Sequence, residues 1–521
     1  MAQIHGQSRQ QIQLICWEQF IDSEHPVRVV DLFVDILDLA KLGYRIKGKS
    51  KEGRPAYQAK TLLKLYLYGY LNRIRSSRQL EKAAQRNIEL FWLLHQVQPG
   101  YKTIADFRKD NPKALLRTFK TFNNFLKGED LLQTDVVAID GTKIAAQNSK
   151  KNNYNEKKIK QHLDYNNRKI EQYLQEMEAL DQEEQAEEEA LVEVAEKLDH
   201  YTAQKAKYEQ LDKQLQAVRT NHQAQLSTVD PDARALPKKM NIVEMSYNVQ
   251  TAVEGQDKLI TNFEITNEND TYALSSVAIE AKKVLEKDHL KVLADKGYDT
   301  GHELKICSAN NIETYVSPRR HRYAKKDPEF TKDKFIYDAS THSYTCPQDK
   351  QLLTNGTWYD KYKNKDKQHR KSYLFQRFSA PFATCKSCPF KEKCVGQTNL
   401  KRSKGRQIER SEYEEEMEAN RERVQLNKDF YRTRQQIVEH PFGTIKRAWG
   451  FHYTLLRTIP KVEGELALIF TCYNLRRSMS IFGLKSLIER LEAVVCPFFA
   501  DLGLFLSPLA VFCLKNRFVV K

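Results

Sequence analysis

Hydrophobic residues recur at three- and four-residue steps through the first quarter of the chain. From Leu32 to about Phe125 the apolar positions, Leu62 and Leu65 among them, repeat with the period of an α-helix. This pattern predicts an all-helical segment over residues 1–125.

The pattern changes to that of a buried β-strand after Thr134. Residues 136–139 are apolar at every position, and Asp140 and Gly141 follow directly. A short continuous apolar run of this kind is typical of a strand covered on both faces. We therefore expect a buried strand that carries a carboxylate at its end.

A long polar insertion separates this strand from the next one. Residues 151–229 show two narrow apolar stripes, one over positions 159–180 and one over 191–218, with an acidic stretch at 176–189 between them. Two antiparallel helical arms explain the two stripes, with the acidic stretch near their tip.

Strands and helices then alternate. The pattern predicts a β-hairpin, a helix, a strand, a further helix and a last strand, with the hairpin at 245–253 and 258–265, the first helix at 274–285, and the strands at 290–294 and 312–316. Three antiparallel strands followed by parallel ones match an RNase H-like mixed α/β sheet. In that fold Asp140 and Asp295, each at a strand end, lie side by side at the centre of the sheet.

The last third of the chain combines a basic segment, helices and an apolar tail. Residues 319–406 are rich in basic and aromatic side chains and hold four cysteines, and helical periodicity resumes near Ser411. Residues 493–514 are apolar except for Asp501 and Ser507, but two prolines interrupt them. A buried helical element or a poorly ordered tail is favoured over a membrane span.

Composition and charge narrow the class of protein. The 521 residues are 40% apolar and 29% charged, which excludes collagen-like, wholly disordered and multi-span membrane proteins. A net charge of +16 favours a polyanionic partner such as nucleic acid. The N-terminus lacks the apolar region of a signal peptide, and the nine cysteines are unevenly spaced, so we expect a cytoplasmic protein.

Basic residues cluster at two places in the helical segment. One cluster precedes the helix at Leu62, and the other follows it: Arg45, Lys47, Lys49, Lys51 and Arg54, then Arg73, Arg75 and Arg78. Any single arginine is explained by a solvated surface, whereas the clustered set predicts DNA contacts.

Three acidic residues are placed for metal-dependent phosphoryl transfer. Asp140 and Asp295 end neighbouring strands, and Glu439 lies on a predicted helix. Carboxylates of this kind hold two Mg²⁺ (or Mn²⁺) ions that neutralise the attacking and leaving oxygens of a phosphodiester. Lys446 is seven residues after Glu439, and so on the same face of an uninterrupted helix.

Three blocks of sequence strongly resemble the DDE transposases of bacterial insertion sequences, in particular the group numbered eleven eighty-two. They are Asp140-Gly141-Thr142-Lys143, Ala294-Asp295-Lys296-Gly297-Tyr298, and Tyr431-x-x-Arg434 followed by Ile437-Val438-Glu439-x-x-Phe442-Gly443-x-Ile445-Lys446. The resemblance implies that Asp140, Asp295 and Glu439 bind metal and that Tyr431, Arg434 and Lys446 handle DNA. Arg434 is five residues before Glu439, whereas the broader superfamily has a spacing of four.

This resemblance divides the chain into functional parts. We expect a DNA-binding domain, a catalytic core interrupted by two insertions, and a tail: 1–125 for DNA binding, 126–150 for the first core strand, 151–229 for the helical hairpin, 230–318 for further core strands and helices, 319–406 for the basic cysteine-containing insertion, 407–480 for the core helices with Glu439, and 481–521 for the tail.

The cysteines of the basic insertion leave two alternatives open. Cys385 and Cys388 are two residues apart, a spacing that lets one turn present two sulfurs to one Zn²⁺, with Cys346 and Cys394 as the other ligands. No second short pair accompanies them, so reduced cysteines without metal explain the sequence equally well.

The sequence thus predicts a DDE transposase that binds the terminal inverted repeats of its element, cleaves them and joins them to target DNA. The expected partners are double-stranded DNA and a second copy of the chain, without a membrane, in a nucleoid-associated cytoplasmic location. The alternatives are an RNase H-like nuclease that does not join strands and an inactive DNA-binding remnant.

Overall fold

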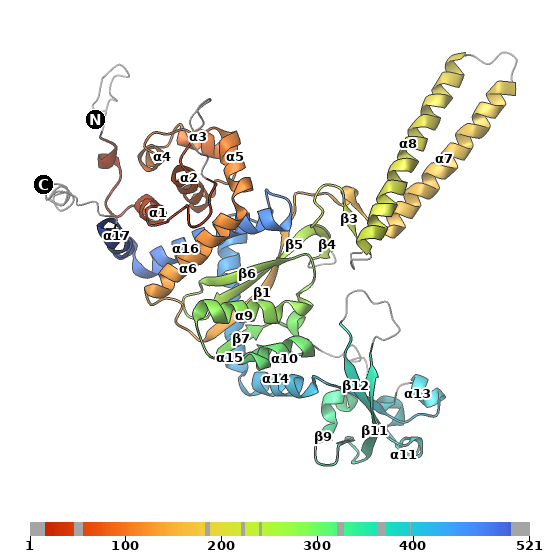
Figure 1. Ribbon diagram of the computed structural model, residues 1–521. Coiled ribbons are helices and arrows are strands. Elements are labelled where there is room, and N and C mark those ends of the chain that lie inside the picture. The colour runs from red at the N-terminus through yellow and green to blue at the C-terminus, as the bar shows by residue number, and fades with distance from the viewer. Residues whose placement is uncertain are drawn as a thin grey trace, which may run out of the picture. The chain divides into compact units, whose positions relative to one another are not determined.

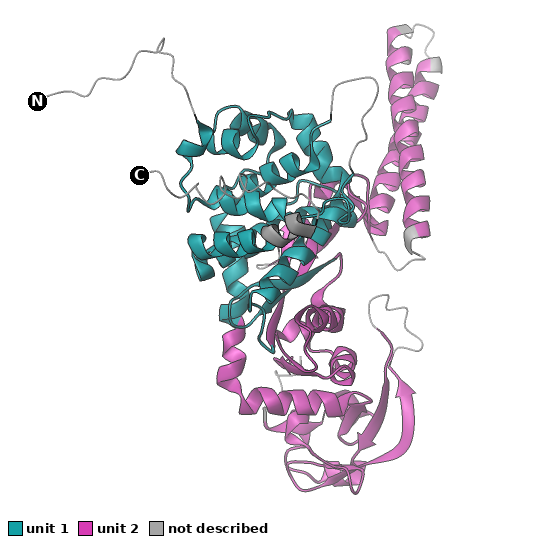
Figure 2. Ribbon diagram, turned by 60° about the vertical axis from the view of Figure 1, so that its left-hand side comes forward, with its two compact units in different colours: residues 1–135, 251–265, 435–521 teal, residues 136–250, 266–434 magenta. Residues whose placement is uncertain are grey.

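The computed structural model divides the chain into two compact units (Figure 2). Unit 1 combines residues 1–135, 251–265 and 435–521, and unit 2 combines residues 136–250 and 266–434. The structure describes residues 16–45, 56–182, 188–219, 225–238, 242–319, 328–361, 371–395 and 397–501. The predicted basic residues Lys47, Lys49, Lys51 and Arg54, and the tail from residue 502 onward, lie outside these ranges.

Unit 1 is helical, which confirms the helical character expected of the first quarter of the chain (Figure 1). Its helices include α1 (Pro26–Asp35), α2 (Ala59–Leu71), α3 (Ser77–Ala84), α4 (Ile88–Leu93), α5 (Tyr101–Asp110), α6 (Pro112–Gly128), α16 (Ile459–Phe482) and α17 (Leu484–Asp501). Helices α2 and α16 are buried on most of their faces, because α16 packs against both α2 and α6.

Two buried asparagines fix strand β6 (Ile260–Thr266) within unit 1. The side chain of Asn474 accepts a hydrogen bond from the Ile260 amide at 2.9 Å and donates one to the Ile260 carbonyl at 2.9 Å. Asn123 donates to the Ile260 and Thr261 carbonyls at 3.1 and 2.8 Å. Helices α6 and α16 thereby satisfy backbone groups that a buried strand edge would otherwise leave unpaired.

A mixed sheet forms the centre of unit 2. Its strands follow the order β4-β5-β1-β7-β8, and β6 also pairs with β5. The bounds are β1 (Val136–Ala145), β4 (Arg234–Pro237), β5 (Val243–Glu254), β7 (Leu290–Ala294) and β8 (Ile312–Val316). Strand β7 is parallel to both β1 and β8. The strands expected at 136–139, 245–253, 258–265, 290–294 and 312–316 are all present.

Helices cover this sheet at several strands. Helix α9 (Leu274–Leu285) packs on β1 and β7, and helices α10 (Gly301–Ala309) and α14 (Glu414–Leu426) pack on β8. Strand β1 runs on through Asp140 to Ala145, so the prediction that it ends at Asp140 is wrong. Only its pairing with β7 ends there.

The insertion between β1 and β5 forms the predicted pair of antiparallel helices (Figure 1). Helix α7 (Glu156–Gln182) lies beside α8 (Glu188–Arg219), and the short strands β2 (Asn153–Tyr154) and β3 (Leu226–Ser227) pair at the base. A cluster of Tyr154, Ile159, Leu211 and Leu215 is buried within the hairpin itself.

A second sheet that the sequence did not predict lies in the basic insertion. It contains five strands in the order β13-β12-β11-β10-β9, all antiparallel to their neighbours. The bounds are β9 (Ile336–Asp338), β10 (Ser343–Thr345), β11 (Gln351–Asp360), β12 (Leu374–Ser379) and β13 (Gln407–Ser411), with short helices α11 (Phe382–Lys386), α12 (Lys391–Cys394) and α13 (Gln397–Lys401) between the last two strands. The sheet includes β13, one strand beyond the boundary expected at residue 406.

Helix α15 (Lys428–Phe442) changes its winding at its C-terminal end. A π-helical segment follows it at Gly443–Ala448, and Pro441 lies inside α15. The prediction that Lys446 lies on the same helix face as Glu439 assumed an uninterrupted α-helix. That assumption is wrong. Among the described helices, none has the length and apolar character needed to cross a membrane.

Candidate active site

The pairing of β1 with β7 brings two of the predicted acidic residues together. Ile139 is opposite Ala294 in the parallel register, and Asp140 and Asp295 are the next residue of each strand. Both side chains are half-buried. Asp140 accepts a hydrogen bond from the Gly141 amide at 3.0 Å, and Asp295 accepts one from the Gly297 amide at 2.6 Å.

A third carboxylate, Asp270, lies against the residues that follow Asp140 and Asp295. It belongs to the short helical turn Asp270–Tyr272 that follows β6. A Cβ atom added to Gly141 would lie 2.5 Å from Asp270 Oδ1, and one added to Gly297 would lie 3.4 Å from Asp270 Oδ2. The two glycines therefore let the backbone after Asp140 and the backbone after Asp295 approach Asp270 closely.

Buried side chains of β5 hold Asp270 in place. Asn248 and Gln250 are fully buried, and each donates a side-chain hydrogen bond to Asp270 Oδ1 at 2.8 Å. Gln250 in turn accepts a hydrogen bond from the hydroxyl of buried Tyr298, three residues after Asp295. A continuous polar network thus links the Asp295 turn, β5 and Asp270.

Arg434 of helix α15 is the cation that opposes these acidic groups. Burial raises the pKa of Asp140 to about 6, Arg434 lowers it, and the neighbouring carboxylates of Asp295 and Asp270 raise it. The Asp140 carboxylate is thus both desolvated and crowded by like charges. Such a site favours the binding of cations.

Tyr431 and Arg319 support the backbone around Asp295. The hydroxyl of Tyr431 donates to the Ala294 carbonyl at 3.2 Å, one residue before Asp295. The guanidinium of Arg319 donates to the carbonyls of Lys296 and Gly297, at 2.9 and 2.5 Å. These hydrogen bonds fix the turn that carries Asp295.

Glu439 and Lys446 belong to the other compact unit. Glu439 is exposed on α15 and accepts a hydrogen bond from the Gln435 side chain at 2.9 Å. Lys446 lies half-buried in the π-helical segment. The structure thus brings Asp140, Asp295 and Arg434 together in unit 2, and the place of Glu439 and Lys446 beside them stays a prediction.

The three predicted DNA-binding arginines of unit 1 differ in their surroundings. Arg73 and Arg78 are exposed, and Arg78 stacks on the Tyr101 ring at 5.2 Å. Arg75 is 6% exposed and forms an ion pair of 2.7 Å with fully buried Glu465. The prediction that Arg75 contacts DNA is wrong, because its guanidinium is used within the core of unit 1.

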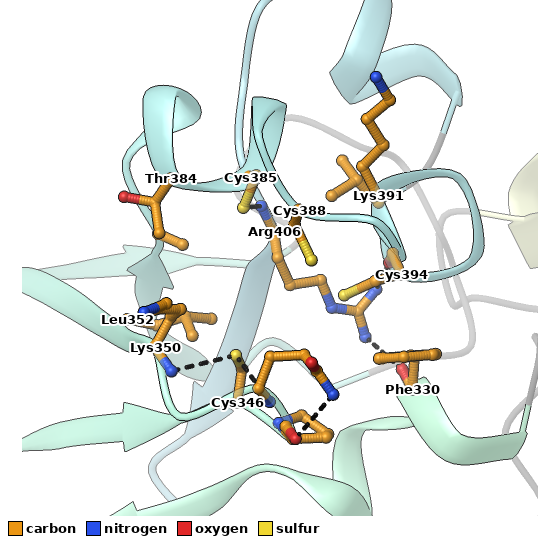
Figure 3. A pocket seen from close by; sticks show the side chains of 14 residues that line it. Phe330, Cys346, Lys350, Leu352, Thr384, Cys385, Cys388, Lys391, Cys394 and Arg406 are labelled. Atoms are coloured by element: carbon orange, nitrogen blue, oxygen red, sulfur yellow. Dashed lines mark hydrogen bonds between the residues drawn. The ribbon is translucent and has the colours of Figure 1, made fainter.

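The four cysteines of the basic insertion line one cavity of about 30 Å³ (Figure 3). Cys346 follows β10, Cys385 and Cys388 come from α11 and the residues after it, and Cys394 ends α12. The structure thus brings together all four residues that the spacing suggested.

Carboxylate oxygens are the donors that Mg²⁺ and Mn²⁺ prefer. Asp140, Asp295 and Asp270 therefore fit a hard divalent cation chemically, and their crowding fits a site that is completed by positive charge. Within the described ranges, no group of three or more His, Cys, Asp or Glu side chains is arranged as a finished metal-ion site.

Two family models match parts of this chain. Residues 15–110 match a transposase domain (DUF772), and residues 345–479 match a transposase DDE domain. The second match includes Glu439 but neither Asp140 nor Asp295. Together the two matches identify an enzyme that transposes DNA. The chain is a DDE transposase of the insertion-sequence type, and DDE domains depend in general on divalent metal ions.

Other comparisons add little. No curated protein matches the chain. A cryo-EM structure of the piggyBac transposase synaptic complex with hairpin DNA is similar over 96% of this chain and 85% of that chain, at 8% sequence identity and a TM-score of 0.34. A likeness at this level carries no argument about fold or function.

Sequence reasoning missed Asp270 and the residues that hold it. Asp270 follows a predicted hairpin strand, where an Asn-Asp pair is explained equally well by a turn. The available signal was in β5, where Asn248 and Gln250 are polar residues at alternate positions of a buried strand.

Proposed function

We propose that this transposase binds the terminal inverted repeats of an insertion sequence, cleaves the DNA strand at each end and transfers the freed 3′ end into target DNA. The observation that carries this proposal is the adjacency of Asp140 and Asp295 after paired residues of β1 and β7, in a chain with a transposase DDE domain match. Membership of the eleven eighty-two group rests on the three sequence blocks alone.

The catalytic core has an RNase H-like topology in this proposal. The strand order β6-β5-β1-β7-β8, with β1, β7 and β8 parallel, supports it. Its first and fourth strands in chain order are β1 and β7, and these carry the two aspartates at adjacent positions. The two insertions interrupt this core after β1 and after β8.

Asp140, Asp295 and Glu439 would hold two divalent ions, Mg²⁺ or Mn²⁺. When bound, such ions neutralise charge on the attacking and leaving oxygens of an in-line displacement. The chain's own part is to fix the carboxylates: the Gly141 and Gly297 amides orient Asp140 and Asp295. Asp270 acts as a positioning residue, because it lies against Gly141 and Gly297 and is itself held by β5.

Exposed and half-buried basic residues bind the DNA in this proposal. Arg73 and Arg78 contact the element ends, and Lys446 and Arg434 contact phosphates near the cleavage site, as the net charge of +16 favours. Tyr431 positions Asp295 through the Ala294 carbonyl and so acts on DNA indirectly. The enzyme works at the bacterial nucleoid.

A homodimer holds the two ends together. The helical hairpin is one surface that supports this part of the proposal, because Tyr165, Leu174 and Val192 are each at least 45% exposed on it. Apolar side chains that the hairpin's own packing does not cover are available to a second copy.

Three substitutions test the catalytic assignment: Asp140→Asn, Asp295→Asn and Glu439→Gln. Each removes one negative charge at nearly constant volume, so each should abolish Mg²⁺-dependent cleavage of end-bearing DNA and leave end binding within about twofold. Asp288→Asn, an exposed aspartate before β7, is the matched control. Substantial cleavage by one variant would remove that residue from the catalytic set, and cleavage without joined products in the wild type would favour a nuclease.

A further inference from the structure

The cavity between the four cysteines is small. Its volume of about 30 Å³ is enough to hold a guest of the size of a water molecule or a metal ion. Four sulfurs from three separate stretches of chain surround it, together with Phe330, Leu352 and Arg406 (Figure 3). Four neighbouring cysteines could form disulfide bonds, but all four are free thiols.

Backbone amides already point at two of these sulfurs. The Gln348 and Lys350 amides donate to Cys346 Sγ at 3.4 and 3.3 Å, and the Arg406 amide donates to Cys385 Sγ at 3.4 Å. The turn around Cys346 includes Asp349 in the left-handed region, at φ 53°. Hydrogen bonds to sulfur stabilise a thiolate over a thiol, and they are the usual outer partners of metal-bound cysteine.

Arg406 places a half-buried positive charge at the same cavity. Its guanidinium donates to the carbonyls of Cys394 and Phe330, at 2.9 and 3.2 Å, while its Nε is buried and has no hydrogen-bond partner in the described part of the chain. A Zn²⁺ ion bound by four thiolates carries a net charge of about −2. The positive guanidinium of Arg406 would offset this negative charge, and a thiolate sulfur would give its Nε a hydrogen-bond acceptor.

The module that contains these cysteines has a small core. Its buried cluster is Phe335, Tyr344, Leu352, Phe378, Ala380 and Ile408, and Cys346, Cys385 and Cys394 pack against the edge of that cluster. Small units with few buried apolar side chains are commonly stabilised by a disulfide or a structural metal. The cysteines lie where a metal would join the five-stranded sheet to helices α11 and α12.

We propose that Cys346, Cys385, Cys388 and Cys394 bind one structural Zn²⁺ ion as four thiolates. Soft sulfur donors in a closed set of four select zinc over the hard cations of the carboxylate site. Four S–H protons pass to solvent and four Zn–S bonds form. The described side chains are not arranged as a metal site. Rotation of the four cysteine side chains would therefore bring their sulfurs to the ion.

The zinc content of the full-length chain tests this proposal. Wild-type protein purified without chelator should contain about one zinc ion per chain by elemental mass spectrometry. The double variant Cys385→Ser/Cys388→Ser and the single variant Cys346→Ser should lose it. Cys16→Ser is the matched control, since Cys16 is an exposed free cysteine of unit 1. Zinc retained by the double variant would overturn the proposal.

A second measurement uses the wild-type protein, so it does not depend on whether the cysteine variants fold. Wild-type protein stripped of metal is titrated with Co²⁺, and the visible absorption of tetrahedral thiolate-bound cobalt should appear and saturate at about one equivalent. Added Zn²⁺ should displace the cobalt and protect four thiols from alkylation. Failure of the wild type to bind either metal, or recovery of these cysteines as disulfides, would overturn the proposal. Neither measurement depends on DNA cleavage. Failure of the zinc proposal can therefore be distinguished from failure of the proposed transposase mechanism.

Discussion

At the scale of single residues, Asp270 is a contact shared by the chain segments that follow Asp140 and Asp295. Its carboxylate lies against Gly141 and Gly297, and its charge contributes to the raised pKa of Asp140. Any side chain at Gly141 would enter the space that Asp270 and Gln250 occupy. The glycine after Asp140, within strand β1, is therefore required by packing.

Replacing Asp270 should slow catalysis without weakening DNA binding. Asp270→Asn removes a negative charge and gives Asn248 and Gln250 a weaker acceptor, so the backbone after Asp140 and after Asp295 loses its support. We expect cleavage to fall by roughly 10- to 100-fold and the Mg²⁺ requirement to rise, as for residues that orient metal ligands. The measurement is the cleavage rate over a Mg²⁺ titration, with Asp288→Asn as control. Wild-type rate and Mg²⁺ dependence in the variant would show that Asp270 has no such role.

Substitutions of Arg75 and Arg78 should have different effects: the first should lower stability, and the second should lower DNA affinity. Arg75→Ala leaves Glu465 buried without its ion-pair partner and removes stacking on the Phe451 and Tyr453 rings, at 4.7 and 4.9 Å. We expect the free energy of unfolding to fall by about 3–5 kcal/mol.

Arg78→Ala is the comparison, since Arg78 is exposed. It should change stability by about 0.5 kcal/mol or less and weaken DNA binding. Urea unfolding and DNA titration of both variants are the measurements. An Arg75→Ala variant as stable as the wild type, but with reduced DNA affinity, would return Arg75 to the DNA-contact set.

At the scale of elements, charge ties the start of helix α14 to Lys332, in the short helical turn Lys332–Lys334 before β9. Glu414, nearly fully buried, accepts hydrogen bonds from Lys332 at 2.7 Å and Arg421 at 3.1 Å. Burial alone would raise the pKa of Glu414, but Lys332 and Arg421 outweigh it and hold the pKa below its ordinary value of 4.5. The folded state therefore binds the proton of Glu414 less tightly than the unfolded state does.

This shift predicts a pH-dependent contribution to stability. Because the pKa is lower in the folded state, Glu414 stabilises the fold above pH 4.5 and loses this contribution as the pH falls below that value. Glu414→Gln should lower the free energy of unfolding by about 2 kcal/mol at neutral pH, and the difference from wild type should shrink in acid. Thermal unfolding from pH 3 to pH 8 is the measurement. Exposed Glu415→Gln is the control, and an equal loss in both variants would contradict the assignment.

At the scale of the whole molecule, the helical hairpin is an element with its own core. Its residues Tyr154, Ile159, Leu211 and Leu215 pack on one another, and His162 stacks on Tyr208 at 4.4 Å. The hairpin closes on itself through β2 and β3, so it can be removed at one place in the chain. This makes its role in assembly open to a direct test.

Replacing residues 156–222 by a short Gly/Ser linker should abolish dimers and leave nicking of a single end intact. Light scattering gives the mass, and nicking of DNA with one end gives the activity. The matched variant Tyr165→Ser/Leu174→Ser/Val192→Ser keeps the hairpin and changes only exposed apolar side chains, and it should also weaken the dimer. A dimer that persists in both proteins would place the subunit contact elsewhere.

The sequence alone determined the secondary structure wherever hydrophobic periodicity was long or uniform. The buried strand before Asp140, the strand before Asp295 and the two helical arms were predicted, because their apolar patterns leave few alternatives. The five-stranded sheet was missed, since three-residue strands such as Ile336–Asp338 and Ser343–Thr345 are too short to show a period.

Only the tertiary structure decided which polar residues share a site. Asp270, Gln250 and Tyr298 meet beside Asp140 because β1, β5 and β7 are neighbours in the sheet, a relation between residues that are far apart along the chain. Arg75 and Arg78 look alike in sequence, but burial beside Glu465 makes the first a core residue. Local pattern fixes where strands and helices form, whereas packing fixes which charges are buried and what they pair with, and this is why the sequence predicted the elements better than the site.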